Sequence, residues 1–445
     1  MSLHGRVLAA GGEGGRRTVA SVLGDRMESG ARLRREVNER ISSDVLSELV
    51  RNHPQQARNE IRGVCEQVFA LPQWSVCDDA MREMLVEDLL DSVFGLGIIQ
   101  PLMDDPSVTE VMVNATDSVY YEKEGRLVRG DVAFSDASQI MMLVDRIVST
   151  VGRRVDESSP MVDARLPDGC RVNVVVPPVA VDGPVVTIRK FGDDVMGLRD
   201  MEASGSLDET VSTLLRWMVH ARCNVAVSGG TGCGKTTLLN ALSCEISPSE
   251  RVVTIEDSAE LRFAGHPHVV RLEARPGNAE GIGEVSIRDL VANALRMRPD
   301  RIIVGECRGA EALDMLQAMN TGHDGSLTTL HANSPHDLVM RLATMVRFGA
   351  DLPVDVIESN IASAIDVVVQ LARASDGRRY VCAIAELGSG GEGRPCVVRE
   401  LYARGPVGAG RWLGEPVWVE SLPEQGIAES EEVKRWRKQC SCACA

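Results

Sequence analysis

The 445-residue sequence predicts an α/β protein with a large parallel-sheet domain, a smaller α/β domain before it, and a helical N-terminal region. Three observations support this fold class. Apolar strand-like runs alternate with helical stretches between residues 224 and 337, which is typical of a parallel sheet covered by helices on both faces. Short β-type runs with one helical stretch occupy residues 101–191. Before them, apolar residues recur at three-to-four spacing.

These patterns divide the chain into consecutive segments. Residues 1–95 are predicted to be a helical region whose first ~25 residues, polar and rich in glycine, are disordered. Residues 96–191 form the smaller α/β domain. Residues 192–208 are polar, contain glycine and are predicted to be a linker. Residues 209–422 form the larger sheet domain.

The remaining segment, residues 423–445, is a polar tail that carries Cys440, Cys442 and Cys444. We expect this tail to be disordered, with a metal site as the alternative. The chain has 12 cysteines and no C-x-x-C pair, which argues against a zinc finger. The cysteines therefore indicate reduced thiols.

Composition and charge limit the possible functions. No run of 18 apolar residues is long enough to span a membrane, and the N-terminus lacks a signal-peptide core, so we expect a cytosolic protein. The formal net charge of −16 argues against nucleic acid as a partner, because binding phosphates needs a concentrated basic surface.

The elements of the large domain follow in order from the sequence. Apolar runs predict strands over residues 224–228, 251–255, 301–304 and 325–330. Helices are predicted over residues 235–246 and 310–319. Two further helices have clear start signals: a capping box from Ser286 to Asp289, and Ser334 as N-cap with Pro335 at the first position. Strand-like runs return from residue 366 to about residue 420.

A glycine-rich loop joins the first of these strands to its helix and fits the pattern G-x-x-x-x-G-K-[ST]. In this pattern successive backbone N–H groups point at a phosphate, the lysine reaches the β- and γ-phosphates, and the hydroxyl after it binds Mg²⁺. The helix also directs its positive end at the anion. The loop and its helix start therefore predict a site for ATP and Mg²⁺ made of Gly229, Gly230, Thr231, Gly232, Cys233, Gly234, Lys235, Thr236 and Thr237.

Other polar residues directly follow the predicted strands. Glu256 and Asp257 follow the second strand, Glu306 follows the third and His331 follows the fourth. Ligands of a parallel sheet bind beyond the carboxyl ends of its strands, so we expect these side chains around one nucleotide.

Each of these residues suits a step of phosphoryl transfer. Glu306 is the predicted carboxylate that orients the attacking water. Asp257, with Glu256 beside it, is predicted to hold Mg²⁺ through its waters, and Thr236 supplies a direct ligand. His331 could donate a hydrogen bond to a γ-phosphate. A role for His323 is left open between function and structure.

Four ordered segments of the chain resemble the secretion ATPase superfamily: 229–236, 254–257, 298–306 and 322–333. They correspond to its Walker A, Asp box, Walker B and His box. Residues 154–173 resemble the CpaF-type ATPases of tight-adherence (Flp) pilus systems. Gly305 stands where the Walker B pattern usually has an aspartate, and the four-cysteine zinc module of the type II secretion branch is missing.

The resemblance implies a RecA-like P-loop NTPase that assembles into a homohexamer, with nucleotide held between the two domains. It also implies arginines of the smaller domain that reach the γ-phosphate. We carry this role to Arg165, Arg171 and Arg189, and a structural role is the alternative for each.

The resulting prediction is a cytoplasmic hexameric ATPase at the inner face of the membrane. It would hydrolyse ATP to power pilus assembly, with an inner-membrane platform protein as partner and peripheral membrane association through that partner. A retraction motor or a conjugation-type ATPase is the nearest alternative. Less favoured are a DNA-translocating motor and a nucleotide-binding scaffold that does not hydrolyse ATP.

Overall fold

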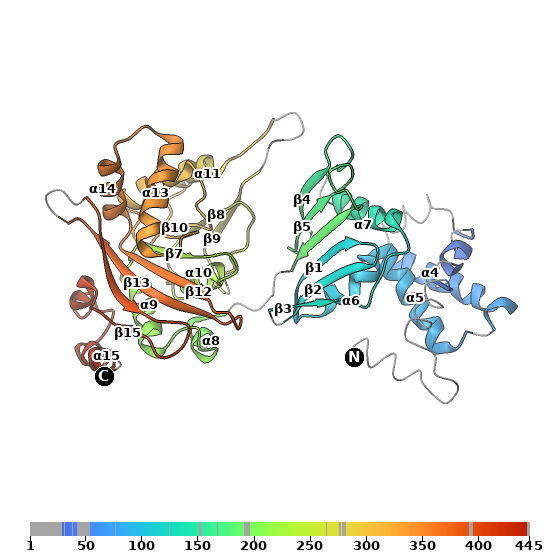
Figure 1. Cartoon of the computed structure of the whole chain (residues 1–445), viewed down its shortest axis with the longest axis horizontal. Helices are drawn as coiled ribbons and strands as arrows, with labels where there is room; N and C mark the ends of the chain where they lie inside the picture. The colour runs from blue at the N-terminus through green and yellow to red at the C-terminus, as the bar shows by residue number, and fades with distance from the viewer. Residues whose placement is uncertain are drawn as a thin grey trace. The chain divides into compact units, whose positions relative to one another are not determined.

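The structure, a computed structural model, describes residues 29–30, 32–37, 39–41, 54–75, 77–123, 125–150, 154–166, 168–190, 196–263, 265–275, 277, 282–390 and 395–442. The chain forms two compact units, Met1–Gly192 and Asp193–Ala445, which are described separately (Figure 1). The predicted disorder of the first ~25 residues concerns a segment outside the described residues. Among the described helices, none combines the length and apolar character that a membrane span requires.

The described part of the first unit begins with helices, as the apolar spacing predicts. The longer ones are α4 (Pro54–Phe69) and α5 (Asp79–Phe94), and Asp78 caps α5 by accepting a hydrogen bond from the backbone N–H of Met81 at 2.8 Å. Ile61, Leu85 and other apolar side chains of this region form a hydrophobic core of their own. The shorter helical turns are η1 (Pro72–Trp74), between α4 and α5, and η2 (Gly97–Ile99) and α6 (Gln100–Asp104), after α5.

A six-stranded antiparallel sheet makes up the rest of the first unit, in the order β3-β2-β1-β6-β5-β4. Helix α7 (Ala137–Thr150) places Ile140, Val144 and Ile147 in the same core as the buried side chains of this sheet. The predicted α/β character of this region is therefore confirmed. The strands are β1 (Val108–Ala115), β2 (Ser118–Lys123), β3 (Arg126–Arg129), β4 (Met161–Arg165), β5 (Arg171–Val175) and β6 (Val185–Arg189).

The second unit contains a nine-stranded sheet in the order β15-β14-β13-β12-β7-β11-β10-β8-β9. Six neighbouring strands, from β12 to β9, pair in parallel. These strands are β7 (Val225–Gly229), β8 (Val252–Glu256), β9 (Val269–Glu273), β10 (Arg301–Val304), β11 (Leu327–Leu330) and β12 (Val367–Arg373). The four strands predicted from apolar runs are thus confirmed, and the P-loop strand β7 lies between β11 and β12.

Helices cover both faces of this parallel sheet, as the near-continuous apolar runs of its strands require. Val225 and Val227 of β7 share one core with α9 (Glu209–His220) and α10 (Lys235–Ser243), whereas Ala226 packs into the other. The helices of the other face are α11 (Ile287–Ala294), α12 (Glu311–Asn320), α13 (Pro335–Gly349) and α14 (Val354–Ala364). The predicted doubly covered sheet is confirmed.

Three antiparallel strands extend the sheet beyond β12: β13 (Arg379–Gly388), β14 (Val397–Ala403) and β15 (Arg411–Trp412). The strand-like runs predicted after residue 366 are therefore strands of the same sheet. Alternation alone does not reveal that they reverse direction, because antiparallel and parallel strands share the same side-chain period.

The predicted linker over 192–208 contains a short helix instead. Helix α8 (Leu198–Ala203) buries Leu198 and Met201 in the core of the second unit. The predicted linker is therefore wrong for this helix. Two apolar side chains within six residues suffice to anchor it to the sheet domain.

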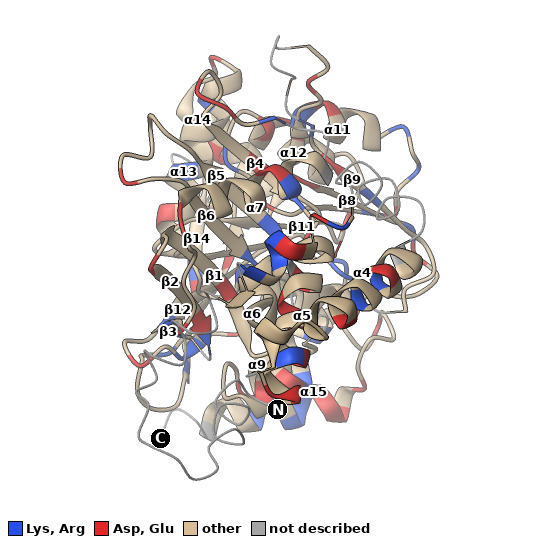
Figure 2. Ribbon diagram, turned by 90° about the vertical axis from the view of Figure 1, so that its right-hand side faces the viewer, with Lys and Arg blue, Asp and Glu red and all other residues tan. Residues whose placement is uncertain are grey.

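The prediction of a disordered tail is wrong as well. After η3 (Val417–Ser421), residues Ser430–Cys442 form helix α15, which buries Val433, Trp436 and Cys440 against the core. The indole N–H of Trp436 donates to the carbonyl oxygen of Thr210 at 2.9 Å. Glu431 and Glu432 lie in the first turn of α15, which suits the helix dipole, and this helix carries both acidic and basic side chains (Figure 2). The ten cysteines with described side chains are free thiols.

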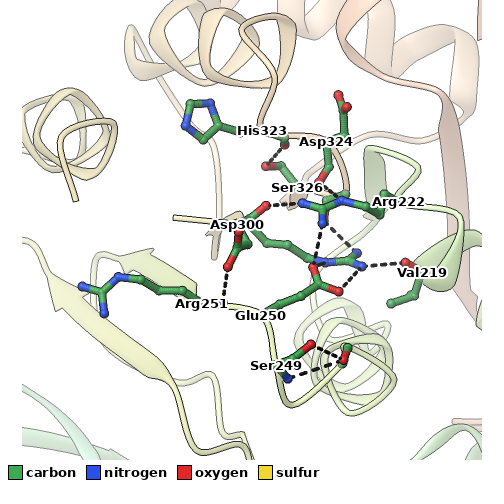
Figure 3. Close-up of polar contacts among 12 residues, drawn as sticks. Val219, Arg222, Ser249, Glu250, Arg251, Asp300, His323, Asp324 and Ser326 are labelled. Atoms are coloured by element: carbon green, nitrogen blue, oxygen red, sulfur yellow. Dashed lines mark hydrogen bonds and ion pairs between the residues drawn. The ribbon is translucent and has the colours of Figure 1, made fainter. Parts of the chain in front are cut away.

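A buried polar network fixes the amino ends of the parallel strands, opposite to the edge where the P-loop lies (Figure 3). Arg301, the first residue of β10, is 1% exposed. Its guanidinium pairs with both carboxylate oxygens of Glu250, at 2.6 and 3.0 Å, and donates to the carbonyl of Val219 at 2.8 Å. This network satisfies a buried charge, which is the condition for tolerating one in a core.

Candidate active site

The glycine-rich loop runs from the end of β7 to the start of α10. Gly234 has φ +97°, a left-handed conformation that favours glycine. A Cβ atom on Gly229 would lie 2.6 Å from the carbonyl oxygen of Leu371 on β12, so the backbones approach too closely there for any side chain. The loop geometry thus depends on glycine at both positions.

Lys235, buried at the start of α10, folds back over this loop. Its ammonium donates to the carbonyl oxygens of Gly229 at 3.1 Å and Gly230 at 3.0 Å. It also lies 3.3 Å from Nδ1 of His331. Because an ammonium can only donate, Nδ1 is the acceptor in this contact and the imidazole is neutral, with its proton on Nε2. Burial, followed by the charge of Lys235, lowers the pKa of His331, which agrees with the neutral form.

The protonated Nε2 of His331 faces Glu306. Nε2 lies 2.7 Å from Oε1 of that carboxylate, and Oε2 accepts from Arg308 at 2.6 Å. Arg308 also lies 3.9 Å from the carboxylate of Asp257. Lys235, His331, Glu306, Arg308 and Asp257 therefore form a continuous series of polar and ionic contacts.

Glu256 stands apart from this chain at the end of β8 and is 4% exposed. Oε1 accepts from the backbone N–H groups of Glu260 at 2.8 Å and Leu261 at 3.0 Å, while Oε2 is buried without a partner. Burial raises the pKa of Glu256 to about 7, against the two N–H donors, which lower it. The carboxyl can thus hold or release a proton near neutral pH.

Gly305, at the position where the Walker B pattern usually has an aspartate, is explained by the same carboxyl. A Cβ atom at Gly305 would lie 2.6 Å from Cγ of Glu256. An aspartate there would displace Glu256 from its two N–H donors. Glycine at position 305, in place of the usual aspartate, therefore leaves the space that the buried side chain of Glu256 occupies.

The structure brings the predicted residues of the second unit to one edge. Strands β7, β8, β10 and β11 are parallel neighbours, and the P-loop, Glu256, Glu306 and His331 follow their carboxyl ends. Thr236 and Thr237 lie in the first turn of α10, directly after Lys235.

His323 is not part of this edge. It precedes β11, and its Nδ1 lies 3.1 Å from the carbonyl oxygen of Ala318. It lies near Ser326 in the network of Figure 3, at the opposite end of the strands. Its contacts are structural.

Cys233 is buried inside the loop, and burial raises the pKa of its thiol, with Lys235 and Arg379 acting in the opposite direction. A raised pKa reduces the reactive thiolate. Cys233 thus has the environment of a packing residue.

Some residues of this edge were missed by sequence reasoning. Arg308 follows Glu306 by two residues, so its place after a strand at the predicted edge could have indicated it. Gln370 interrupts the apolar run of β12; its amide contacts the Ser228 hydroxyl of β7 and donates to the carbonyl of Ala332 at 2.9 Å. A single polar residue in a buried strand is the signal for such a bridge.

The three arginines predicted to reach the nucleotide lie in the first unit. Arg165 ends β4, Arg171 begins β5 and Arg189 ends β6, and the strand register pairs Arg165 with Arg171 and Arg171 with Arg189. Directly paired residues share one face of an antiparallel sheet, so the three cations form a row across neighbouring strands.

The residues of the P-loop edge fit a magnesium nucleotide. The loop backbone, the N-terminus of α10 and Lys235 are the donor set for a polyphosphate. Thr236 and Asp257 offer the oxygen ligands that Mg²⁺ prefers, with its remaining positions left to water and phosphate. The buried Oε2 of Glu256 lacks a partner in the protein, as expected of a group that faces a bound species.

Comparisons with known proteins show the family of this chain. Residues 93–398 match the family described as "Type II/IV secretion system protein". Rv3659c of Mycobacterium tuberculosis is named provisionally as a conjugal transfer protein. It is 42% identical to this chain over 315 residues, which cover 69% of this chain and 89% of that protein. The conjugal transfer protein TrbB of Rhizobium radiobacter is 33% identical over 281 residues, covering 62% and 83%.

A solved structure is similar as well. The VirB11 ATPase from the Brucella suis type IV secretion system, in complex with sulphate, is 31% identical with a TM-score of 0.36. The similarity covers 66% of this chain and 97% of that chain.

Proposed function

Because the chain belongs to the type II/IV secretion system protein family, we propose that it is an ATP hydrolase that powers assembly of a tight-adherence (Flp) type IV pilus or a related secretion system. The single observation that supports ATP hydrolysis is the chain of contacts from Lys235 through His331 to Glu306. A lysine of a phosphate loop is thereby joined to a carboxylate on a neighbouring strand. A scaffold that only binds nucleotide has no need of this connection.

The proposed roles follow from the contacts. Lys235 binds the β- and γ-phosphates, and on binding them its ammonium exchanges carbonyl partners for phosphate oxygens. Glu306 orients the attacking water, and Arg308 and His331 hold its carboxylate in place. Thr236 and Asp257 hold Mg²⁺, which neutralises the phosphate charge when bound.

Glu256 is a second candidate acceptor of a proton in this proposal. Its pKa of about 7 lies near the working pH, where general acid–base groups are most effective. Its closed environment, with two backbone donors on one oxygen, suits a group that holds a proton rather than one that binds metal directly.

We propose that the arginine row of β4, β5 and β6 supplies positive charge to the γ-phosphate. The planar guanidinium pairs with two phosphate oxygens at once, and three such groups in one row offer this charge at adjacent positions. Homohexamer formation belongs to this proposal, because the resemblance to secretion ATPases implies it. The expected partner is an inner-membrane platform protein, which would bring the ATPase to the cytoplasmic face of the membrane.

A conjugation-type ATPase is the second candidate function. The observation in its favour is the similarity to proteins named for conjugal transfer. A retraction motor would use the same site chemistry. The acidic net charge of −16 remains the argument against a motor that moves along DNA.

Two measurements on the purified full chain test the enzymatic proposal. We expect turnover of Mg-ATP that DNA does not stimulate, and a larger particle in light scattering when a non-hydrolysable ATP analogue is added. Absence of ATP turnover would contradict the enzymatic proposal. Deleting the gene in its native host then separates the two systems, because loss of surface pili supports assembly and loss of plasmid transfer alone supports conjugation.

A further inference from the structure

The hairpin between β12 and β13 carries two arginines beside the phosphate loop. Arg373 is the last residue of β12 and Arg379 is the first of β13, and the strand register places them directly opposite each other. The turn is closed by hydrogen bonds from the N–H of Ala374 to the carbonyl of Arg378 at 2.8 Å and from the N–H of Gly377 to that of Ala374 at 3.0 Å. Both side chains therefore leave the same face of the hairpin.

This face points at the glycines of the loop. A Cβ atom built on Gly232 would lie 3.6 Å from Nη1 of Arg373, and one built on Gly234 would lie 3.5 Å from Cδ of Arg379. The hairpin is also fixed at its base, because Leu371 pairs with Gly229 at the start of the loop. The arginines are thus held at the loop by main-chain pairing, although both side chains are exposed.

Electrostatics agrees with this placement. Arg373, Arg379 and Lys235 bring three positive charges close to the loop, where a polyphosphate would bring several negative oxygens.

We propose that Arg373 and Arg379 are phosphate-binding residues that act with Lys235 on the polyphosphate of the bound nucleotide, an inference that rests on the proposed ATPase function. A polyphosphate in the loop offers several anionic oxygens, and Lys235 is a single point charge. Two guanidinium groups beside the loop supply the planar, multiple donors that phosphate oxygens accept well. They belong to the same unit as the loop, unlike the arginine row of β4, β5 and β6.

Nucleotide binding tests this proposal with an internal control. Fluorescent analogues of ATP, ADP and AMP are titrated into the full-length wild type, into the double variant Arg373→Gln/Arg379→Gln, and into Arg378→Gln. The control removes the same kind of charge from the same turn, but Arg378 contacts Asp376 and the carbonyl of Pro406 instead of the loop.

We expect the double variant to bind the triphosphate about 10-fold more weakly, with a smaller loss for the diphosphate and the least for the monophosphate. High salt should reduce the difference. Arg378→Gln should bind like wild type, and Arg373→Lys/Arg379→Lys should recover part of the affinity. Thermal unfolding without nucleotide shows whether each variant is folded.

Three results would overturn the proposal: unchanged triphosphate binding by the double variant, an equal loss in Arg378→Gln, or an equal loss for all three nucleotides. The last would indicate that the arginines only support the loop structure. Failure of the wild type to bind any of the nucleotides would instead contradict the proposed function itself.

Discussion

Nε2 of His331 lies 2.7 Å from Oε1 of Glu306, although the two residues follow different strands of the sheet. The same imidazole lies 3.3 Å from the ammonium of Lys235 through Nδ1. A neutral histidine thus connects the lysine that faces the phosphates with the carboxylate proposed to orient water.

Replacing His331 with alanine should therefore slow turnover more than it weakens nucleotide binding. We expect kcat to fall about 100-fold, a typical loss for a group that positions proton transfer, while the Kd for ATP changes only a little. Steady-state kinetics and fluorescence titration give the two quantities. His336→Ala is the matched control, because this exposed histidine lies on α13 outside the contact chain. If the His331 variant has the same kcat as the wild type, the histidine has no role in turnover.

The raised pKa of Glu256 predicts that the free energy of unfolding depends on pH. Its pKa is raised from 4.5 to about 7 in the folded protein, so the folded state holds this proton more tightly than the unfolded chain. This contribution is complete below pH 4.5 and is lost as the pH rises through about 7. The full effect amounts to about 3 kcal/mol in the free energy of unfolding.

Glu256→Gln removes this titration and keeps an oxygen that can accept from Glu260 and Leu261. Urea unfolding between pH 5 and pH 8.5 should show the wild type losing stability relative to the variant as the pH rises. Parallel curves for the two proteins across this range would show that Glu256 titrates at its ordinary value.

The contacts of Arg301, at the opposite end of the sheet, predict that replacing it lowers the stability of the protein. Its guanidinium pairs in a bidentate manner with Glu250 and donates to two backbone carbonyls, those of Val219 and Gly325. A lysine cannot reproduce this planar set of donors, so Arg301→Lys should lower the free energy of unfolding by about 3 kcal/mol. Arg296→Lys, an exposed replacement of the same type, should have little effect. Equal unfolding curves for both variants would refute the structural importance of the network in Figure 3.

Helix α15 should stabilise the second unit. Trp436 packs against Trp217 and Trp412, with ring centroids 5.7 and 5.0 Å away, and its N–H is bonded to Thr210. Trp436→Ala should therefore cost about 3–5 kcal/mol, the range for a large buried aromatic side chain. The exposed neighbour Arg435 gives the control, Arg435→Ala. If chemical denaturation finds the tryptophan variant as stable as the control, the helix does not contribute to the core.

The sequence predicts the centre of the second unit well because local signals coincide there. The predicted strand over residues 301–304 has the same limits in the structure, and Ser286 and Ser334 cap the helices that they were expected to begin. The glycine-rich loop adds a motif that requires a strand before it and a helix after it. These elements were predictable because the spacing of apolar residues, the helix-capping residues and the glycine-rich motif all indicated the same structure.

The features that were mispredicted or missed depend on tertiary contacts. Helix α15 has few apolar residues among many charges, and only packing against Trp217 and Trp412 explains why Trp436 is buried. Arg373 and Arg379 are six residues apart on an exposed hairpin, and no spacing rule relates them to Gly232 and Gly234, about 140 residues earlier. Pairing of β12 with β7 creates this proximity.

The most direct test of the proposed ATPase is the variant Glu306→Gln. The amide keeps the size of the side chain and its contact with His331 but cannot polarise water as a carboxylate does. We predict that the variant binds ATP with a Kd close to that of the wild type while its kcat falls at least about 100-fold. Turnover equal to the wild type would contradict the assignment of Glu306, and with it the role of the contact chain from Lys235.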